Sequence, residues 1–466
     1  MKPLWTSQEM EAATLGRATC AFEAGGVSID TRTLKAGDMF VALQGDARDG
    51  HQFVTMALAR GAAAAMVSQR HDDFPANAPL LRVAHTLRGL EDLGRAARTR
   101  ARAKIVAVTG SAGKTTTKEM LRLAFESLGA THGSLASYNN HWGVPLSLSQ
   151  LPRECAFGVF EIGMNHFGEI RSLVSLSRPE VAIVTTIASA HLEYFGSLEA
   201  IADAKSEIFE GLVQGGRAIV PADIPCSSRL IARARQAGVE HILTFGEAAH
   251  SNARLLSVDE SADGMVLEAD ILGRRYRVRI GAVGTHMAQN TLATLLAVAV
   301  SGGDVQQAGA ALAGFSALKG RGARFAVTLT DGSVEIIDES YNANPASMRA
   351  ALSVLGVSSP GTGGRRIAVL GDMLELGADS TALHAALAPP VEAARTDLVF
   401  ACGRDMRALF DALPATCRGS WGATSADIAP DVVRSSRAGD VILVKGSFGS
   451  RMAVVLDALK SGGEPS

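Results

Sequence analysis

A glycine-rich segment between an apolar stretch and a helical stretch has the residue types of a phosphate-binding loop. It reads VAVTGSAGKTTTKEM over residues 106–120. Backbone N–H groups that converge at a helix N-terminus bind a phosphate anion, and glycines permit the tight turn that this requires. Lys114 can reach the outer phosphates of a nucleotide, and the Thr115 hydroxyl can bind Mg²⁺. The segment predicts an ATP site that includes Thr109, Gly110, Ser111, Ala112, Gly113, Lys114, Thr115 and Thr116.

The spacing of this loop differs from the G-x-x-x-x-G-K-[ST] pattern of the common phosphate loop. Val108 stands where the first glycine is expected, and Gly110 and Gly113 enclose only two residues. Phosphate binding needs converging N–H groups rather than this spacing, so the shorter turn leaves the prediction intact. An ordinary strand-to-helix turn with a chance G-K-T is the weaker alternative.

Two further residues predict a magnesium centre beside this loop. Glu161 lies in the apolar stretch FGVFEI (157–162), and His191 follows VAIVTTI (181–187) by four residues. The carboxyl ends of parallel strands share one sheet edge, so Glu161 and His191 should gather near Thr115. A carboxylate buried there without a partner is costly, so a cation or hydrogen-bond donors are expected. Taken alone, Glu161 could equally form a salt bridge and His191 could be an ordinary core residue.

Lys205 lies on a predicted helix over residues 197–209, with Ser197 as its N-cap. It falls one turn after Ile201 and one turn before Phe209, within the apolar stripe of that helix. The residues by themselves favour a lysine whose stem is buried and whose ammonium group reaches water.

The elements that must position these residues are predicted to form an α/β protein. Uninterrupted apolar strands alternate with helical stretches, which indicates parallel sheets covered on both faces. The first set of strands covers residues 105–109, 157–162 and 181–187, and a second set covers 334–338, 366–372, 398–403 and 440–447. The first hundred residues hold short strands such as 39–43 and an Ala-rich helix around 53–65.

Two turn-rich or basic segments divide the chain into three predicted domains. RAARTRARAK (95–104) is interpreted as a solvated helix end that leads into a linker, and LKGRGAR (318–324) as a second boundary. The predicted domains are therefore residues 1–102, 103–317 and 318–466.

The composition argues against several classes of protein. The formal net charge is −2 and no long run of Lys or Arg occurs, so no nucleic-acid partner is expected. The apolar stretch 292–300 is too short to span a bilayer and predicts a buried helix, so no membrane insertion is expected. The first residues contain no apolar signal core, and the five cysteines form no C-x-x-C pair. These features favour a cytoplasmic protein.

The shortened loop, T-G-x-x-G-K-T-T, resembles that of the Mur ligases and folylpolyglutamate synthases. Further segments extend the resemblance to the Mur ligase family over nearly the whole chain. They are SIDTRTLKAGDMFVALQGDARDGHQF (28–53), SYNNHWGVPLSL (137–148), EIGMNHFGEI (161–170), SAHLEYFGS (189–197), AKSEIF (204–209), IDESYNANPASM (337–348), VLGDMLELG (369–377) and VILVKGS (441–447).

The resemblance implies three domains and a reaction. These are a small N-terminal α/β domain for the UDP sugar, a central P-loop ATPase-like domain with a parallel sheet, and a C-terminal Rossmann-like domain. ATP would phosphorylate the carboxylate of UDP-N-acetylmuramoyl-tripeptide, and the amine of D-alanyl-D-alanine would displace the phosphate, in peptidoglycan precursor synthesis. The implied cofactors are ATP and two Mg²⁺ ions, and the implied state is a monomer. Whether the tripeptide ends in diaminopimelate or lysine stays open.

The resemblance also implies roles for individual residues. Lys114, His191 and Lys205 would be catalytic, and Thr115, Glu161 and His191 would bind metal. Lys205 matches a lysine that is often carbamylated in the family, which turns a cation into a carboxylate analogue able to bind a second Mg²⁺.

Other residues match positions that contact the nucleotide or the substrates. Asn290 would lie near adenine, Asp338 would border ATP, and either Arg321 or Arg324 would contact ATP, with Arg324 favoured because it immediately precedes a strand. The implied substrate-binding residues are Ser28, Thr31, Arg32, Asn139, Asn140, His141, Tyr341, Asn342, Asn344 and Lys445.

The chain departs from the family pattern at two places. Met287 stands where an asparagine is common, so any role of that asparagine is absent. Phe448 and Gly449 intervene before Arg451, which leaves the placement of the last basic contact open while Lys445 remains.

Two other functions remain as alternatives. The first is another carboxylate–amine ligase; the N-terminal UDP-type segment argues against a folate enzyme, and SYNANP (340–345) argues against the diaminopimelate-adding step. The second is a nucleotide-binding switch without enzymatic activity, which would need neither Lys205 nor a second α/β domain.

Overall fold

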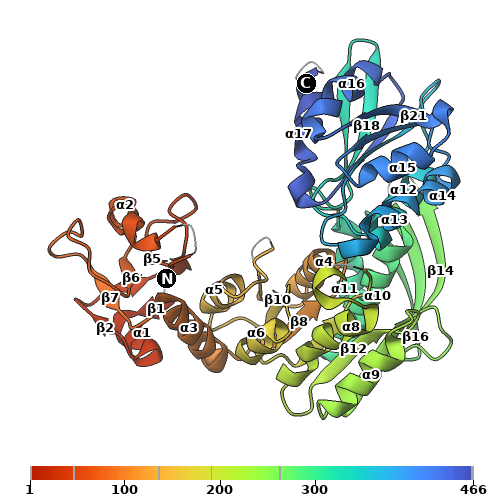
Figure 1. Cartoon of the computed structure of the whole chain (residues 1–466). Helices are drawn as coiled ribbons and strands as arrows, with labels where there is room; N and C mark the ends of the chain where they lie inside the picture. Colours follow the sequence, from red (N-terminus) through yellow and green to blue (C-terminus); the bar gives the residue numbers. More distant parts are fainter. Residues whose placement is uncertain (1–2, 46–47, 135–136, 190–191, 262–263, 463–466) are drawn as a thin grey trace.

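Three large sheets follow one another along the chain (Figure 1). The computed structural model describes residues 3–45, 48–134, 137–189, 192–261 and 264–462. The N-terminal and C-terminal sheets lie at opposite ends of an angled molecule, and the central sheet joins them (Figure 1). The predicted α/β class is confirmed, and each sheet falls within one of the three predicted domains.

The N-terminal domain is built on a small, mostly parallel sheet of order β2-β7-β6-β5-β4. A two-stranded ladder of β1 and β3 lies beside it. The elements are β1 (Trp5–Thr6), α1 (Ser7–Thr14), β2 (Arg17–Ala18), β3 (Glu23–Ala24), β4 (Gly26–Ser28), β5 (Asp38–Val41), a 3-10 turn (Gly50–Phe53), α2 (Val54–Ala59), β6 (Ala64–Val67), β7 (Leu80–Arg82) and α3 (Thr86–Arg100).

The Ala-rich helix predicted around 53–65 is wrong in its second half. Helix α2 ends at Ala59, Gly61 turns the chain with φ of +89°, and Ala64–Val67 form the buried strand β6. Alanine prefers helix by a fraction of a kcal/mol (~0.5 kcal/mol per residue against other residues), which pairing with both β5 and β7 overrides.

The interpretation of residues 95–104 as a solvated helix end is only partly right: a helix does end there, but two of its arginines are largely buried. Helix α3 continues to Arg100, and the side chains of Arg98 and Arg100 are only 11% and 13% exposed. Arg98 donates hydrogen bonds to the carbonyl groups of Ser177 and Arg178 and pairs with Glu180 at 2.7 Å. Arg98 therefore attaches α3 to the central domain, whereas Arg100 lies over the Trp5 ring of the N-terminal domain.

The central domain contains a nine-stranded sheet of order β16-β15-β14-β13-β12-β11-β8-β10-β9. The strands from β9 to β14 are parallel, as the apolar runs predicted. Its strands are β8 (Lys104–Thr109), β9 (Thr131–Gly133), β10 (Phe157–Glu161), β11 (Val181–Val184), β12 (Arg217–Pro221), β13 (His241–Gly246), β14 (Ala253–Ser261), β15 (Gly264–Ile271) and β16 (Arg274–Ile280). Sequence reasoning missed the antiparallel extension β14–β16.

Helices cover this central sheet and carry the functional segments. They are α4 (Lys114–Glu126), α5 (Gly143–Ser149), α6 (Glu169–Ser177), α7 (Leu192–Phe195), α8 (Leu198–Ser206), α9 (Ser227–Gln236), α10 (Thr285–Val300) and α11 (Val305–Ala311), with 3-10 turns at Glu207–Gly211 and Leu312–Gly314. The predicted N-cap is confirmed, because the Ser197 hydroxyl accepts the N–H of Ala200 at 3.1 Å. The predicted buried helix at 292–300 is the second half of α10.

The C-terminal domain is a six-stranded sheet of order β17-β18-β22-β19-β20-β21, parallel except for β17. Its strands are β17 (Ala323–Leu329), β18 (Gly332–Glu339), β19 (Arg366–Gly371), β20 (Leu398–Cys402), β21 (Arg418–Gly422) and β22 (Val441–Lys445). Its helices are α12 (Pro345–Val357), α13 (Ser380–Ala385), α14 (Ala388–Ala393), α15 (Met406–Ala412), α16 (Ser425–Ser435) and α17 (Ala453–Gly462), with 3-10 turns at Gly377–Asp379, Ala415–Cys417 and Phe448–Ser450.

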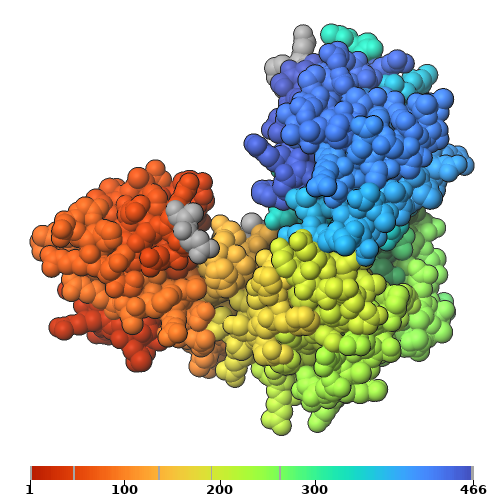
Figure 2. Space-filling model, in the orientation of Figure 1, coloured from red at the N-terminus to blue at the C-terminus, as the bar shows by residue number. Residues whose placement is uncertain are grey.

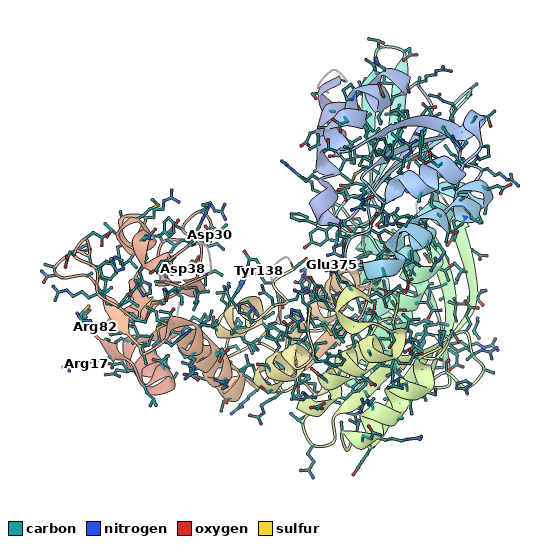
Figure 3. The ribbon with its side chains drawn as sticks, viewed as in Figure 1. Arg17, Asp30, Asp38, Arg82, Tyr138 and Glu375 are labelled. Atoms are coloured by element: carbon teal, nitrogen blue, oxygen red, sulfur yellow. The ribbon has the colours of Figure 1, made fainter. Side chains whose placement is uncertain are left out.

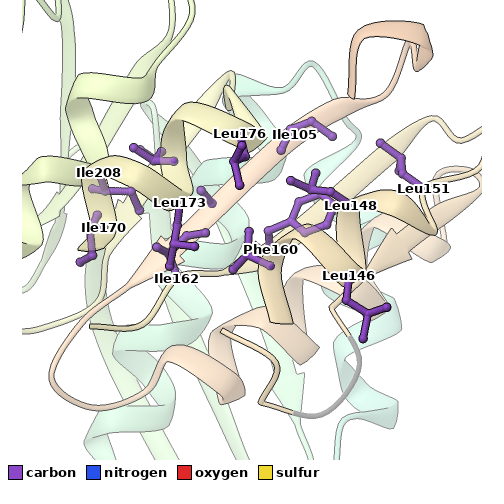
Figure 4. Packing of buried hydrophobic residues seen from close by; sticks show 14 of the residues in the cluster. Ile105, Leu146, Leu148, Leu151, Phe160, Ile162, Ile170, Leu173, Leu176 and Ile208 are labelled. Atoms are coloured by element: carbon purple, nitrogen blue, oxygen red, sulfur yellow. The ribbon is translucent and has the colours of Figure 1, made fainter. Parts of the chain in front are cut away.

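One continuous apolar core joins the N-terminal and central domains. It extends from Trp5 and Leu90 to Phe160 and Leu173. Figure 4 shows its central part, where Phe160 lies among the leucines of α5 and the side chains of α6. The indole N–H of Trp5 donates to the carbonyl of Ser149 at 2.8 Å. The C-terminal domain instead has its own cores on the two faces of its sheet.

Candidate active site

The carboxyl ends of the central strands open into a pocket of about 1490 Å³ between the central and C-terminal domains. Its walls include the glycine-rich loop, the segment after β10, the start of α10, the segment after β18 and the end of β22. On the molecular surface, a wide hollow separates the N-terminal domain from the C-terminal domain (Figure 2). The pocket itself lies at the junction between the central and C-terminal domains.

The glycine-rich loop joins β8 to α4 and has the conformation that only glycine allows. Gly110 has φ of +153° and Gly113 has φ of +80°. A Cβ on Gly110 would lie 1.9 Å from the hydroxyl of Thr185, and a Cβ on Gly113 would lie 2.8 Å from the amide oxygen of Asn290. The Thr185 hydroxyl donates to the carbonyl of Ala112 at 2.5 Å. The turn is therefore fixed by β11 on one side and α10 on the other.

Thr115 and Glu161 form a buried pair of oxygen donors beside the loop. The Thr115 hydroxyl donates to one carboxylate oxygen of Glu161 at 2.8 Å, and the Asn139 amide donates to the other at 2.7 Å. Glu161 is 1% exposed. Hydroxyl and carboxylate oxygens are the ligands that Mg²⁺ prefers, so this pair fits the ion that the sequence predicts.

Two lysines place positive charge in the same region. Lys114 donates to the carbonyl of Gly110 at 2.8 Å. Burial lowers the pKa of Lys114, and the nearby Glu161 carboxylate opposes this effect. Lys205, at the end of α8, is 2% exposed. Burial lowers the pKa of Lys205 well below its usual value, and the charge of Lys114 lowers it further. Lys205 is thus buried rather than reaching water.

His191 lies outside the described residues, so its predicted place beside Glu161 has no structural counterpart here. Within the described part of the chain, no three His, Cys, Asp or Glu side chains converge as a metal-binding group. The oxygen donors that do converge come from Thr115 and Glu161.

Asn290 faces the loop from α10 with an unused hydrogen-bond donor. The residue is 6% exposed, and its amide nitrogen has no hydrogen-bond partner among the described residues. A buried donor without a partner is costly, so the amide suits a ligand that supplies an acceptor. Asn290 also lines the pocket.

The structure separates the two arginines that sequence reasoning left open. Arg321 lines the large pocket, donates to the Ser137 hydroxyl at 3.4 Å and stacks on the Tyr341 ring at 4.1 Å. Arg324, which the sequence favours, lies in β17 and pairs with Glu335 at 3.0 Å. It lines a separate cavity of about 310 Å³. The geometry therefore favours Arg321 for a ligand in the large pocket.

The segment after β18 and the end of β22 bring four predicted residues to the pocket wall, namely Tyr341, Asn342, Asn344 and Lys445. Asn344 caps α12 by accepting the N–H of Ser347 at 2.9 Å, and its amide donates to the carbonyl of Ser111 at 3.4 Å. Lys445 is 1% exposed and pairs with Glu339 at 3.1 Å. Asn344 thus links the C-terminal domain directly to the glycine-rich loop.

The surroundings of Asp338 differ from the predicted contact with ATP. It is 1% exposed and does not line the large pocket. Its carboxylate accepts the N–H of Gly320 at 2.9 Å and the hydroxyl of Ser340 at 2.6 Å. In this structure it holds the interdomain linker against β18.

Matches to known domain families agree with this arrangement of three sheets. Residues 108–298 match the Mur ligase middle domain, residues 323–448 match the Mur ligase glutamate ligase domain, and residues 23–101 match the Mur ligase family catalytic domain. Together these matches cover most of the chain. The chain belongs to the Mur ligase family.

Two curated relatives of this Mur ligase have the same name. The chain is 35% identical to the UDP-N-acetylmuramoyl-tripeptide–D-alanyl-D-alanine ligase of Escherichia coli, with 94% of each chain covered. It is 33% identical to the ligase of that name from Bacillus subtilis, with 94% of this chain and 93% of the relative covered.

Solved structures of Mur ligases have the same fold over nearly the full length. MurF from Acinetobacter baumannii superposes with a TM-score of 0.85 at 30% identity, covering 98% of this chain and 99% of that one. MurF from Thermotoga maritima in complex with ADP superposes with a TM-score of 0.78 at 25% identity, covering 94% and 97%.

The predicted N-terminal residues of this Mur ligase lie apart from the large pocket. Ser28 ends β4, and its hydroxyl donates to the carbonyl of Asp30 at 3.1 Å. Arg32 is paired with Asp30 at 2.6 Å, and the carbonyl of Thr31 accepts from Arg60. The pKa of Arg32 is raised, first by its hydrogen bonds to Asp30 and less by Tyr138.

Tyr138 and its neighbours connect these N-terminal residues with the large pocket. Tyr138 lies between Asp30 and Glu375 in the view of Figure 3. Asn139, Asn140 and His141, which follow it, all line the pocket. The side chain of Asn140 also accepts the N–H of Gly143, the first residue of α5, at 2.9 Å.

The structure accounts for the two departures from the family pattern, at Met287 and at the residues before Arg451. Met287 is 3% exposed and packs in a core of the central domain. Phe448 is 75% exposed and lies 6.0 Å from the Tyr341 ring, while Arg451 is exposed and outside the large pocket. Lys445 is therefore the basic residue of this segment that reaches the pocket.

Several pocket residues were missed by sequence reasoning. Glu339, His286 and the segment from Met164 to Glu169 line the pocket. Burial lowers the pKa of His286, with Glu339 opposing the effect. Glu339 directly follows the strand predicted at 334–338, so its position at a carboxyl end was a usable signal. His286 gives no such signal, because only the tertiary structure brings α10 to the C-terminal domain.

Proposed function

We propose that this protein joins D-alanyl-D-alanine to UDP-N-acetylmuramoyl-tripeptide, using ATP. The products are UDP-N-acetylmuramoyl-pentapeptide, ADP and phosphate. The observation that carries the proposal is the glycine-rich loop with Lys114 and the Thr115–Glu161 pair, in a chain whose full-length relatives are named for this ligation. The reaction belongs to peptidoglycan precursor synthesis.

The residues present suit transfer of the ATP γ-phosphoryl group to a carboxylate. The loop N–H groups and Lys114 bind the phosphates and offset the charge that develops on them. Thr115 and Glu161 would hold a Mg²⁺ ion, which when bound neutralises phosphate charge and polarises the phosphoryl group. Arg321 and Asn290 contact the nucleotide, and Asp338 keeps the linker in place beside it.

The product of the first step is an acyl phosphate on the tripeptide. The amine of D-alanyl-D-alanine then attacks the acyl carbon, the C–N bond forms, and inorganic phosphate leaves. Because water would hydrolyse the acyl phosphate, a pocket enclosed by two domains favours ligation over hydrolysis. The candidate substrate residues of this pocket are Asn139, Asn140, His141, Tyr341, Asn342, Asn344 and Lys445.

The remaining roles complete the proposal. His191 would join Thr115 and Glu161 as a metal ligand, and a carbamylated Lys205 would help to hold a second Mg²⁺. Ser28, Thr31 and Arg32 bind the uridine diphosphate, since a guanidinium group suits diphosphate oxygens. We propose domain boundaries at residues 102/103 and 317/318, and a monomer.

We propose that the enzyme acts in the cytoplasm. Its five cysteines are all free, which fits a reducing compartment. None of the helices in the described ranges has the length and hydropathy needed to cross a bilayer.

A substrate panel tests the reaction. ATP turnover should require both UDP-N-acetylmuramoyl-tripeptide and D-alanyl-D-alanine, and mass spectrometry should show the pentapeptide product. Turnover that depends instead on D-glutamate, diaminopimelate or a folate would refute the proposal. Tripeptides ending in diaminopimelate and in lysine, compared in the same assay, would identify the preferred third residue.

Lys114→Ala tests the assignment of the loop. Loss of one charge-stabilising group typically costs about 10²- to 10³-fold in kcat, so ligation should fall at least that far. The folded state should persist, because Lys114 makes one hydrogen bond within its own loop. Ligation at the parent rate by a folded Lys114→Ala variant would exclude this loop as the site of phosphoryl transfer.

A further inference from the structure

The segment that follows Glu161 reaches the pocket without a local N-cap for its helix. Residues 163–169 line the pocket and lead into α6. The N-cap position is Gly168, with φ of +84° and no side chain to accept the free N–H groups. A helix start in a packed region needs an acceptor for these donors, so one must come from elsewhere in the chain.

Glu207, which directly follows α8, supplies that acceptor. Its carboxylate accepts the N–H of Gly168 at 2.8 Å and the N–H of Arg171 at 3.1 Å. The side chain of Glu207 is only 5% exposed. Its negative charge lies at the positive end of the α6 dipole, which stabilises a buried carboxylate. Glu207 therefore caps a helix that begins almost forty residues earlier in the chain.

Apolar packing fixes the same contact. Ile208, the next residue, lies in one core with Ile170 and Leu173 of α6 (Figure 4). A Cβ on Gly211 would meet the Val174 side chain at 2.6 Å, so the 3-10 turn and α6 are closely packed. This packing thus fixes the distance between the Glu207 carboxylate and α6.

Glu207 is close in the sequence to one residue of the proposed metal centre, and it contacts the segment that follows the other. Lys205 lies two residues before it, and the segment that it caps begins directly after Glu161. A second carboxylate, Glu169, accepts the N–H of Asn165 at 2.7 Å within that segment. Movement of the Glu207 carboxylate would therefore shift Lys205 relative to the Glu161 side of the pocket.

We propose that Glu207 is a positioning residue that sets the separation of Lys205 and Glu161. The proposal rests on the proposed function, because it assigns a metal centre to these two residues. Glu207 itself contacts neither substrate nor metal. It acts through the N-terminus of α6.

The experiment compares Glu207→Ala with a matched control on the same turn. Glu210 pairs with the side chain of Arg171 at 2.9 Å, and among the described residues it accepts no backbone N–H of α6. Glu210→Ala therefore removes an acidic residue and an ion pair while leaving the cap in place. Glu207→Gln retains an amide oxygen that can accept an N–H, so it tests whether the acceptor or the charge matters.

Two readouts that do not need catalysis decide the proposal. Amide hydrogen exchange over residues 163–171 should become faster in Glu207→Ala and stay unchanged in Glu210→Ala. Affinity for Mn²⁺ in the presence of ADP, followed by electron paramagnetic resonance, should fall about 10- to 100-fold in Glu207→Ala, as for other residues that orient metal ligands. Glu207→Gln should retain most of both properties.

Other outcomes would overturn the proposal. Faster exchange with unchanged Mn²⁺ affinity in Glu207→Ala would make Glu207 a structural cap only. An equal loss of affinity in Glu210→Ala would assign the effect to general charge. If Glu207→Ala does not fold, Glu207→Ser takes its place, because its short hydroxyl cannot reach both N–H groups. Loss of Mn²⁺ affinity in the folded Glu207→Ser variant supports the proposal, and parent affinity contradicts it. A failure of ligation in the substrate panel would refute the proposed function while leaving these two measurements interpretable.

Discussion

Two lysines with lowered pKa values lie in the same buried region of the central domain. Burial is the main cause for both Lys114 and Lys205, and each lysine is close enough to other charges for them to matter. Burying these two ammonium groups therefore costs folding free energy and serves no purpose in the protein without nucleotide. Such a cost is typical of functional sites, where the missing anion arrives with the ligand.

The pH dependence of protein stability should reveal the free-energy cost of burying Lys205. Because its folded pKa is below the unfolded value, the unfolded chain binds more protons in the window below pH 10.5, and stability from this group falls as pH falls through that window. Lys205→Met removes the effect. With bicarbonate removed, so that Lys205 carries a free amine, the variant should unfold at higher denaturant than the parent at pH 7, and the gap should narrow toward pH 10.

The same substitution separates stability from activity. Lys205→Met should lose about 10²-fold or more in ligation, as expected when a ligand that orients a catalytic metal is removed. Activity of the parent should rise with added bicarbonate, and intact mass spectrometry should show the carbamate after mild trapping. A parent enzyme that ignores bicarbonate, together with a fully active Lys205→Met, would contradict carbamylation.

At the scale of elements, the strand–loop–helix unit of β8 and α4 depends on its neighbours. Gly110 and Gly113 are confined by Thr185, which directly follows β11, and by Asn290 on α10. The loop is thus preorganised by two other elements rather than by its own sequence. A preorganised loop loses less entropy when it binds phosphate.

A pair of glycine substitutions distinguishes backbone strain from this confinement. Gly113 and Gly215 both have positive φ, +80° and +73°, but a Cβ meets Asn290 at the first and no atom within 4 Å at the second. Each alanine variant should lose about 1–2 kcal/mol of stability from the left-handed conformation. Only Gly113→Ala should weaken ADP binding, measured by calorimetry, because its methyl displaces Asn290. Equal ADP affinities in the two variants would argue against a preorganised loop.

At the scale of the whole molecule, the three domains are joined unequally. The N-terminal and central domains share one apolar core, and Arg98 and Trp5 add hydrogen bonds across the junction. The C-terminal domain has separate cores and reaches the central domain through the linker and polar contacts such as Asn344 to Ser111. We therefore expect the first two domains to unfold together and the third to unfold more independently.

Trp5→Ala tests this expectation. Removal of a buried tryptophan costs about 3–5 kcal/mol, and the loss should appear in both domains that share the core. Hydrogen exchange should increase in α5 of the central domain as well as in β1, with the C-terminal sheet unaffected. An increase confined to the N-terminal domain would show that the shared core does not couple the two.

Much of the fold follows from local patterns in the sequence. Apolar runs predict the central strands, and Ser197 predicts the start of α8, because backbone pairing and capping depend on nearby residues. The structures of residues 62–65 and 95–104 do not follow from local patterns. Their alanines and arginines have ambiguous preferences, and contacts with distant strands and with α6 decide their structure.

The residues of the candidate site also fall into two groups: those that local sequence predicts and those that only the tertiary structure places. The sequence by itself determines the glycine-rich loop, the carboxylate that ends β10 and the family to which they belong, since each is encoded in a contiguous segment. Only the tertiary structure decides that Arg321 rather than Arg324 faces the large pocket, that Asp338 holds the linker, and that Glu207 caps α6. These contacts join residues far apart in the chain, and their distances depend on how whole domains pack.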